Sequence, residues 1–169
     1  MHKPVTAAVA TRLASQGRLN LDAPLRTLEP SSGGSAAITP RQLLNQTSGF
    51  SRTQGFSIPS PDTAGFSNLQ PAGSPGAYAY SNLNYVVLGQ EIRSQTGAAF
   101  EAVVAREVFG PLAMSSTAAI APDQCGHRLF FGLVTPWAEE PVPGHLAPAG
   151  FIRASAPDLG KFMTAILAQ

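Results

Sequence analysis

Two short segments of the sequence contain residue types that can transfer protons. Lys3 stands near the beginning of an alanine-rich stretch, and Tyr80-Ser81-Asn82 follows a long segment rich in Gly, Pro and Ser. Lysine and tyrosine are among the side chains that serve as general acids and bases. Taken singly, each feature has an ordinary structural interpretation. Lys3 is typical of a solvated surface lysine, and Tyr80-Ser81-Asn82 is typical of a helix cap with an aromatic neighbour.

Other catalytic and binding patterns are missing from the sequence. It has no G-x-S-x-G nucleophile elbow, no phosphate-binding G-x-x-x-x-G-K-[ST] and no dinucleotide-binding G-x-G-x-x-G. His2, His127 and His145 lack the spacing of metal ligands, and Cys125 with His127 supplies too few ligands for zinc. Glu139-Glu140 lies in a Pro-rich segment, which is typical of a solvated loop. We therefore expect neither a metal nor a cofactor.

The composition is that of a globular protein. The 169 residues are 44% hydrophobic and 12% charged, with a formal net charge of +1, so they can bury a core and are not disordered. The basic residues are scattered, which argues against nucleic-acid binding. No apolar run is long enough for a membrane span, and no signal peptide is visible. The compartment and the oligomeric state are not indicated.

The candidate residues stand at predicted helix starts. The spacing of Val5, Val9 and Leu13 predicts a helix over residues 4–16, ended by Gly17. A second helix begins after residue 39, where Thr-Pro-x-Gln forms a capping-box pattern. In residues 51–79, thirteen of 29 are Gly, Pro or Ser, which indicates a long connection that is disordered or part of a binding site.

The second half of the chain holds three more predicted helices. One begins at Ser81 or Asn82 and ends at Gly97, and another covers residues 100–108. Residues 111–154 are irregular apart from one short strand at 129–134. The last helix has a capping box made by Ser155 and Asp158, and its apolar residues follow the helical period through residue 167. The chain is therefore expected to be mostly helical.

The order of these segments resembles the serine β-lactamases and penicillin-binding proteins, specifically the class C β-lactamases with their esterase and D-aminopeptidase relatives. That family has Ser-x-x-Lys at a helix start, then Tyr-x-Asn, then Lys-Thr-Gly or His-x-Gly on a late strand. Lys3 fits the first motif and Tyr80-Ser81-Asn82 the second. The resemblance spans nearly all of the chain. The other segments that are similar to the family are residues 17–24, 38–50, 84–89, 148–151 and 155–159.

The resemblance implies a catalytic set of Lys3, Tyr80 and Asn82. Lys3 would lie beside a serine three residues earlier, since residues i and i+3 share one helix face. The amine acts as a base only when neutral, so burial or nearby positive charge must lower its pKa. Tyr80 would pass a proton between the serine and the leaving group, and Asn82 would hydrogen-bond the lysine or the substrate amide. The implied substrate is a β-lactam, a D-amino-acid peptide or a small ester.

Two parts of the family pattern do not appear. Counting back from Lys3 places the serine immediately before Met1, and no Lys-Thr-Gly or His-x-Gly follows Phe151. We therefore expect residues 1–169 to be one partial domain, a fragment of the α/β (α+β) penicillin-recognising transpeptidase-like fold, with sheet strands missing at both ends. The chain as given is expected to be inactive, because loss of a nucleophile costs on the order of 10⁶ in rate. An extracytoplasmic or periplasmic location is compatible with the family.

Two alternatives to an enzyme fragment stay open. One is a non-catalytic relative that binds a peptidoglycan-like ligand or a protein partner. The other is a helical interaction domain, which predicts that Lys3 and Tyr80 lie far apart. If a sheet is indeed missing, we also expect Val5, Val9 and Leu13 to be underburied and the isolated chain to be only marginally stable.

Overall fold

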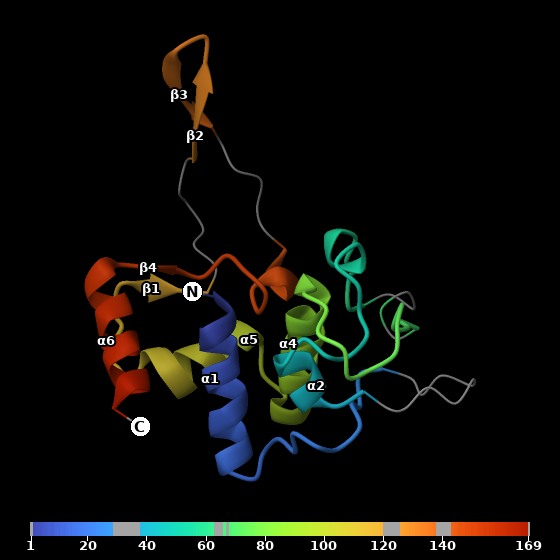
Figure 1. The fold of residues 1–169 in the computed structure, drawn as a ribbon. Helices are drawn as coiled ribbons and strands as arrows, with labels where there is room; N and C mark the ends of the chain where they lie inside the picture. Colours follow the sequence, from blue (N-terminus) through green and yellow to red (C-terminus); the bar gives the residue numbers. More distant parts are fainter. Residues whose placement is uncertain are drawn as a thin grey trace.

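The computed structural model describes residues 2–28, 38–62, 66, 68–119, 126–137 and 143–168. Cys125 and Glu139-Glu140 lie outside the described residues, as does the side chain of His127. Most of the described chain is helical, with two small antiparallel pairs of strands (Figure 1). No helix among these residues is long and apolar enough to cross a membrane.

Helix α1 (His2–Ser15) confirms the first predicted helix and begins two residues earlier than expected. It contacts α4, α5 and η2, and Figure 1 shows it between α6 and the pair of α2 and α4. Val5, Val9 and Leu13 are fully buried, so the expectation that they would be underburied was wrong. The other helices cover this face of α1 without help from a sheet.

Helix α2 (Pro40–Leu44) begins with the predicted capping box. The Thr39 side chain accepts from the backbone N–H of Gln42, and the Gln42 side chain accepts from that of Thr39. The segment that follows α2 contains the 3₁₀ turn η1 (Gln54–Phe56). Apart from Phe66, which is helical, the rest of the described part of residues 51–79 consists of turns and irregular chain, as the Gly, Pro and Ser content predicted.

Helix α4 (Asn82–Thr96) has buried residues along most of its length and packs against α2, η1 and α5. Ser81 is its N-cap residue but makes no capping hydrogen bond, and Gly97 ends the helix in the left-handed conformation (φ 67°). Helix α5 (Phe100–Val104) continues directly into one π-helical turn, η2 (Ala105–Phe109). Together α1, α4, α5 and η2 enclose most of the hydrophobic core.

The strands differ from the prediction. Instead of one strand at 129–134, β2 (Gly126–Phe130) and β3 (Leu133–Trp137) form an antiparallel hairpin. The reversal uses Phe131 (φ 47°) and Gly132 (φ 80°), and positive φ at both central residues is what a type I′ turn requires. Figure 1 shows this hairpin standing away from the helices. Strands β1 (Thr117–Ala118) and β4 (Arg153–Ala154) form the second pair.

The 3₁₀ turn η3 (Gly144–Leu146) precedes β4, and helix α6 (Ala156–Leu167) follows it. The Ser155 side chain caps α6 as predicted, but the carboxylate of Asp158 does not complete the capping box. It accepts instead from the backbone N–H of Ser116 (2.7 Å) and from Thr117 and Lys161, which fastens α6 to β1. Part of the apolar face of α6 stays exposed at Met163, Ile166 and Leu167.

Candidate active site

Lys3 lies where three separate parts of the chain meet. Its Nζ donates to Oδ1 of Asn82 (2.8 Å) at the start of α4, and to the backbone carbonyl of Ala149 (2.9 Å) just after η3. No carboxylate of the described residues pairs with this amine. Lys3 is therefore held by neutral oxygens, 79 and 146 residues away in the sequence.

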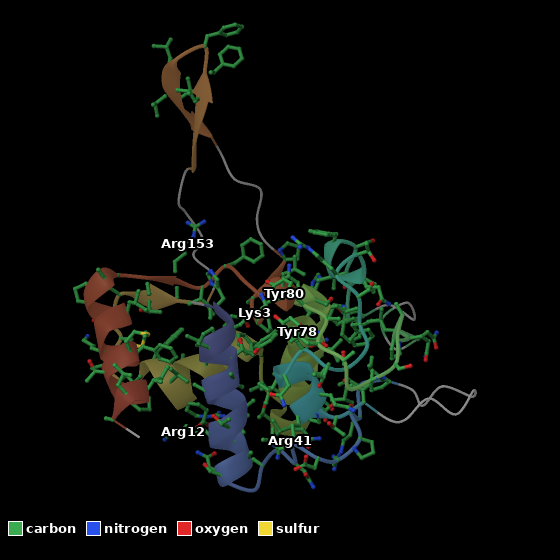
Figure 2. All side chains as sticks on the ribbon, viewed as in Figure 1. Lys3, Arg12, Arg41, Tyr78, Tyr80 and Arg153 are labelled. Atoms are coloured by element: carbon green, nitrogen blue, oxygen red, sulfur yellow. The ribbon has the colours of Figure 1, made fainter. Side chains whose placement is uncertain are left out.

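Tyr80 joins the same cluster through the same acceptor. Its hydroxyl donates to Oδ1 of Asn82 (3.1 Å), so the lysine amine and the phenol share one oxygen. The amine also lies over the rings of Tyr80 and Tyr85, 5.0 and 5.6 Å from their centroids. Figure 2 shows Lys3 close to Tyr80. Tyr80 is 43% exposed, whereas Tyr85 is buried. Burial, followed by the nearby Tyr78 and Tyr80, raises the pKa of Tyr85.

The shared oxygen of Asn82 argues against one of the alternatives drawn from the sequence, the helical interaction domain. A helical interaction domain would leave Lys3 and Tyr80 far apart, but both make hydrogen bonds to Asn82. The three residues named from the motifs are thus one cluster, with the phenol open to solvent. Ser81, between Tyr80 and Asn82, is fully buried, and its hydroxyl has no hydrogen-bond partner among the residues that the structure describes. It cannot serve as a solvent-accessible nucleophile.

A buried hydrogen bond and a close contact fix the Ala149 carbonyl. Thr6, one turn after Lys3, donates to the carbonyl of Pro148 (2.7 Å), which ties α1 to this segment. On the other side Pro148 packs directly on Gly89 of α4, where a Cβ would lie 2.1 Å from the proline ring. Only glycine permits this approach, so Gly89 helps to place the carbonyl that accepts from Lys3.

The start of α4 is held by Gln46 and Ser48. Oε1 of Gln46 accepts from the backbone N–H of Ser81 (2.8 Å) and from the amide of Asn84 (2.7 Å). The carbonyl oxygen of the Asn84 side chain in turn accepts from the hydroxyl of Ser48. These buried bonds explain why Gln46 adopts a left-handed conformation (φ 61°). They also leave the side chain of Asn82 free for Lys3 and Tyr80.

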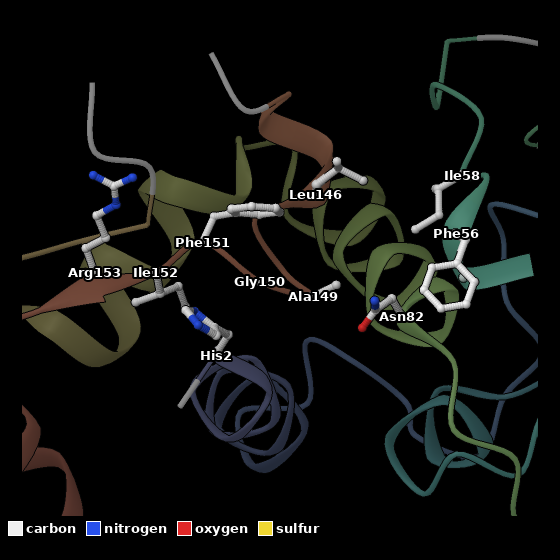
Figure 3. A pocket seen from close by; sticks show the side chains of 11 residues that line it. His2, Phe56, Ile58, Asn82, Leu146, Ala149, Gly150, Phe151, Ile152 and Arg153 are labelled. Atoms are coloured by element: carbon white, nitrogen blue, oxygen red, sulfur yellow. The ribbon is translucent and has the colours of Figure 1, made fainter. Parts of the chain in front are cut away.

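A pocket of about 630 Å³ opens beside the cluster (Figure 3). Asn82 and Ala149, which both accept from Lys3, belong to its lining. Most of the remaining lining is apolar, and it contains no acidic residue. The lining residues are His2, Gly55, Phe56, Ile58, Asn82, Leu146, Ala149, Gly150, Phe151, Ile152 and Arg153.

His2 brings a polar atom to this pocket. Its Nδ1 is buried and without a hydrogen-bond partner in the described structure. Burial, with a contribution from Lys3, lowers the pKa of His2. The imidazole therefore favours its neutral form.

Glu107 anchors the far end of α1. Its carboxylate accepts from Arg12 and Gln16 at the end of α1, from Arg18 in the following turn, and from Arg106 beside it. The hydrogen bond from Arg106 is the main reason that the pKa of Glu107 falls to about 2, with smaller contributions from the other three side chains. This ion cluster joins α1 to η2.

Sequence reasoning missed several residues that build the site. The backbone carbonyl of Ala149 has no sequence signature, although residues 148–151 stood among the segments that resemble the family. Thr6 and Gln46 gave no separate signal, because their partners lie 142 and 35 to 38 residues away. The pocket residues Phe56 and Ile58 come from the 51–79 segment, which its length and composition predicted to be either disordered or part of a binding site.

Comparison with known proteins identifies the family. Residues 1–169 match the family model described as Beta-lactamase. The chain is 27% identical over 176 residues to PbpX of Bacillus subtilis, a protein named as a penicillin-binding protein, covering 98% of this chain and 44% of that one.

Solved structures with a similar fold belong to the same group of proteins. A D-stereospecific amidohydrolase from Streptomyces sp. is 26% identical, with a TM-score of 0.75, over 98% of this chain and 58% of its own. A class C β-lactamase is 20% identical, with a TM-score of 0.78, over 99% and 49%. The fold is therefore the penicillin-recognising fold, and the chain spans about half the length of the relatives it matches. The chain belongs to the Beta-lactamase family, within the superfamily of serine β-lactamases and penicillin-binding proteins.

Proposed function

We propose that residues 1–169 supply the acid–base side of a serine acyl-transfer site, in a protein that hydrolyses a β-lactam, a D-amino-acid peptide or a small ester. One observation carries the proposal: the amine of Lys3 and the hydroxyl of Tyr80 share Oδ1 of Asn82 at the edge of an open pocket. The relatives named as a penicillin-binding protein and a D-stereospecific amidohydrolase support acyl chemistry of this kind.

The hydrogen bonds of Lys3 leave one position on its nitrogen for the nucleophile. An ammonium group has three hydrogens, and Lys3 donates to two oxygens, Oδ1 of Asn82 and the carbonyl of Ala149. One position remains for a serine oxygen. A serine three residues before Lys3 would lie on the same helix face, one turn away. We propose that the Lys3 nitrogen, with a lone pair at that third position, takes the serine proton as the serine oxygen attacks the acyl carbon.

We propose that Tyr80 donates a proton to the leaving group. Its hydroxyl is held by Asn82 while the side chain stays 43% exposed, so a substrate atom can approach it. As the acyl bond breaks, Tyr80 would give its proton to the leaving nitrogen or oxygen and recover one from Lys3. Asn82 would keep both groups in register, because its one oxygen accepts from each of them.

The test uses the gene product that contains these residues, with steady-state hydrolysis of a chromogenic cephalosporin and of p-nitrophenyl acetate. Lys3→Met and Tyr80→Phe are expected to lower kcat by roughly 10² to 10⁴, the usual contribution of a general acid or base. Tyr78→Phe is the matched control, since Tyr78 is 72% exposed and has no hydrogen bond in the described structure. Equal rates for Tyr80→Phe and Tyr78→Phe would contradict the proposed role of Tyr80.

The identity of the residue encoded before Met1 distinguishes the enzyme proposal from the alternative of a non-catalytic binding protein. A serine codon there, in frame, is what the enzyme proposal requires, and the 169-residue chain alone is then expected not to hydrolyse either substrate. Another residue at that place, together with saturable binding of a peptidoglycan peptide without turnover, would favour a binding protein instead.

A further inference from the structure

Phe151 adopts a backbone conformation that its side chain disfavours. Its φ is 69°, in the left-handed region, where bulky side chains are rare. Three other residues besides glycine share this region, and each has a local reason. Gln46 is held by its buried side-chain bonds, Ala113 ends a helical turn, and Phe131 occupies a hairpin turn. Phe151 directly follows the turn closed by the N–H of Gly150 and the carbonyl of Leu146 (3.1 Å), a place where a left-handed residue is common but a bulky side chain is unfavourable.

The side chain of Phe151 forms one wall of the pocket next to Lys3. Figure 3 shows its ring on one side, Phe56 and Ile58 on the other, and Asn82 between them. The two phenylalanines are exposed, by 45% for Phe151 and 74% for Phe56. Phe151 thus contributes little to the core, and its strained backbone directs an aromatic ring toward the pocket. Strain of this kind is retained most often where it serves a function.

The pocket suits an apolar group of substrate size. Its volume of about 630 Å³ falls in the range of ordinary ligand sites. Two exposed rings and Ile58 gain by losing contact with water, whereas a polar group would find no hydrogen-bonding partner on these side chains. Asn82 and Ala149, which accept from Lys3, line the pocket on one side, and its other polar lining residues are His2 and Arg153.

We infer that Phe151 is a specificity-determining residue that selects substrates whose acyl group carries an aromatic or similarly large apolar side chain. This inference deepens the proposed function and rests on it. The acyl carbon would lie near Lys3 and Asn82, with its apolar side chain between Phe151 and Phe56.

The test compares two small probes that differ by one phenyl ring, N-phenylacetylglycine and N-acetylglycine. Their dissociation constants from the gene product that contains residues 1–169 are measured by ligand-observed NMR titration. The phenylacetyl compound is expected to bind about tenfold more tightly, since one ring face buried on an apolar wall accounts for a factor of this order. In Phe151→Asn the ratio is expected to fall close to one, and in Phe151→Tyr, which keeps the ring, it is expected to persist.

Phe131→Asn is the matched control. Phe131 also has a positive φ and is 91% exposed, but it lies on the hairpin and outside the pocket. Asn tolerates the left-handed region, so neither variant is expected to unfold. Equal loss of the ratio in both variants, an unchanged ratio in Phe151→Asn, or no preference in the unaltered protein would each overturn the inference. Because binding is measured without turnover, a failure to acylate refutes the proposed function alone.

Discussion

Replacement of Glu107 by glutamine tests how α1, which carries Lys3, is held in place. Glu107 is only 5% exposed and pairs with three arginines that are 39 to 51% exposed. These partners, led by Arg106, lower its pKa from 4.5 to about 2. By proton linkage this difference corresponds to at most about 3 kcal/mol of folding free energy. Solvent screening of the half-exposed arginines reduces the expected loss in Glu107→Gln to about 1–2 kcal/mol at pH 7.

The sign of the pH dependence follows from the lowered pKa. The stabilisation is fully present above pH 4.5, where the carboxylate is ionised in both the folded and unfolded states, and is lost as pH falls from 4.5 to about 2. Urea unfolding of both proteins at pH 7, 5 and 3 measures this directly. The gap in free energy of unfolding is expected to be equal at pH 7 and 5 and less than half as large at pH 3.

Glu101→Gln is the control, because Glu101 lies on the adjoining helix α5 and forms no ion pair in the described structure. Its effect is expected to stay within about 0.5 kcal/mol at every pH. A gap for Glu107→Gln that stays constant from pH 7 to pH 3 would refute the reasoning, since the loss would then come from altered packing and not from the charge.

Two further substitutions test the segment that carries the Ala149 carbonyl. Thr6→Val leaves the carbonyl of Pro148 buried without its donor and is expected to cost about 1–3 kcal/mol in urea unfolding; an unchanged midpoint would contradict this. Gly89→Ala places a methyl group against the Pro148 ring, 2.1 Å away before relaxation, and is expected to cost about 1–3 kcal/mol by overpacking. A fully stable Gly89→Ala protein would show that this contact is not needed.

Local sequence signals predicted most helices because each helix carries its own start, period and end. The Thr39 and Gln42 capping box and the Gly97 end are contacts within a few residues, so they can be read from the sequence. The hairpin could not be told from one strand, since its turn needs positive φ at Phe131 and only Gly132 favours that conformation. The burial of Val5 and its neighbours depends on helices far along the chain.

The site could be predicted only in part, because some of its residues stand in recognisable motifs and others do not. Lys3, Tyr80 and Asn82 were found from motif order, and the structure brings them together. Whether they catalyse a reaction remains a prediction. The oxygens and walls around them could not be predicted individually, because Ala149 acts through its backbone and Phe151 through a conformation that no local pattern indicates.

Acylation of the gene product that contains residues 1–169 tests the central proposal most directly. The protein is incubated with a β-lactam and with a D-alanyl ester, its intact mass is measured, and any adduct is located by peptide mapping. The proposal predicts one covalent adduct, on a serine three residues before Lys3, that forms roughly 10² to 10⁴ more slowly in Lys3→Met. An adduct on another residue, or one that forms at the same rate in Lys3→Met, would contradict it.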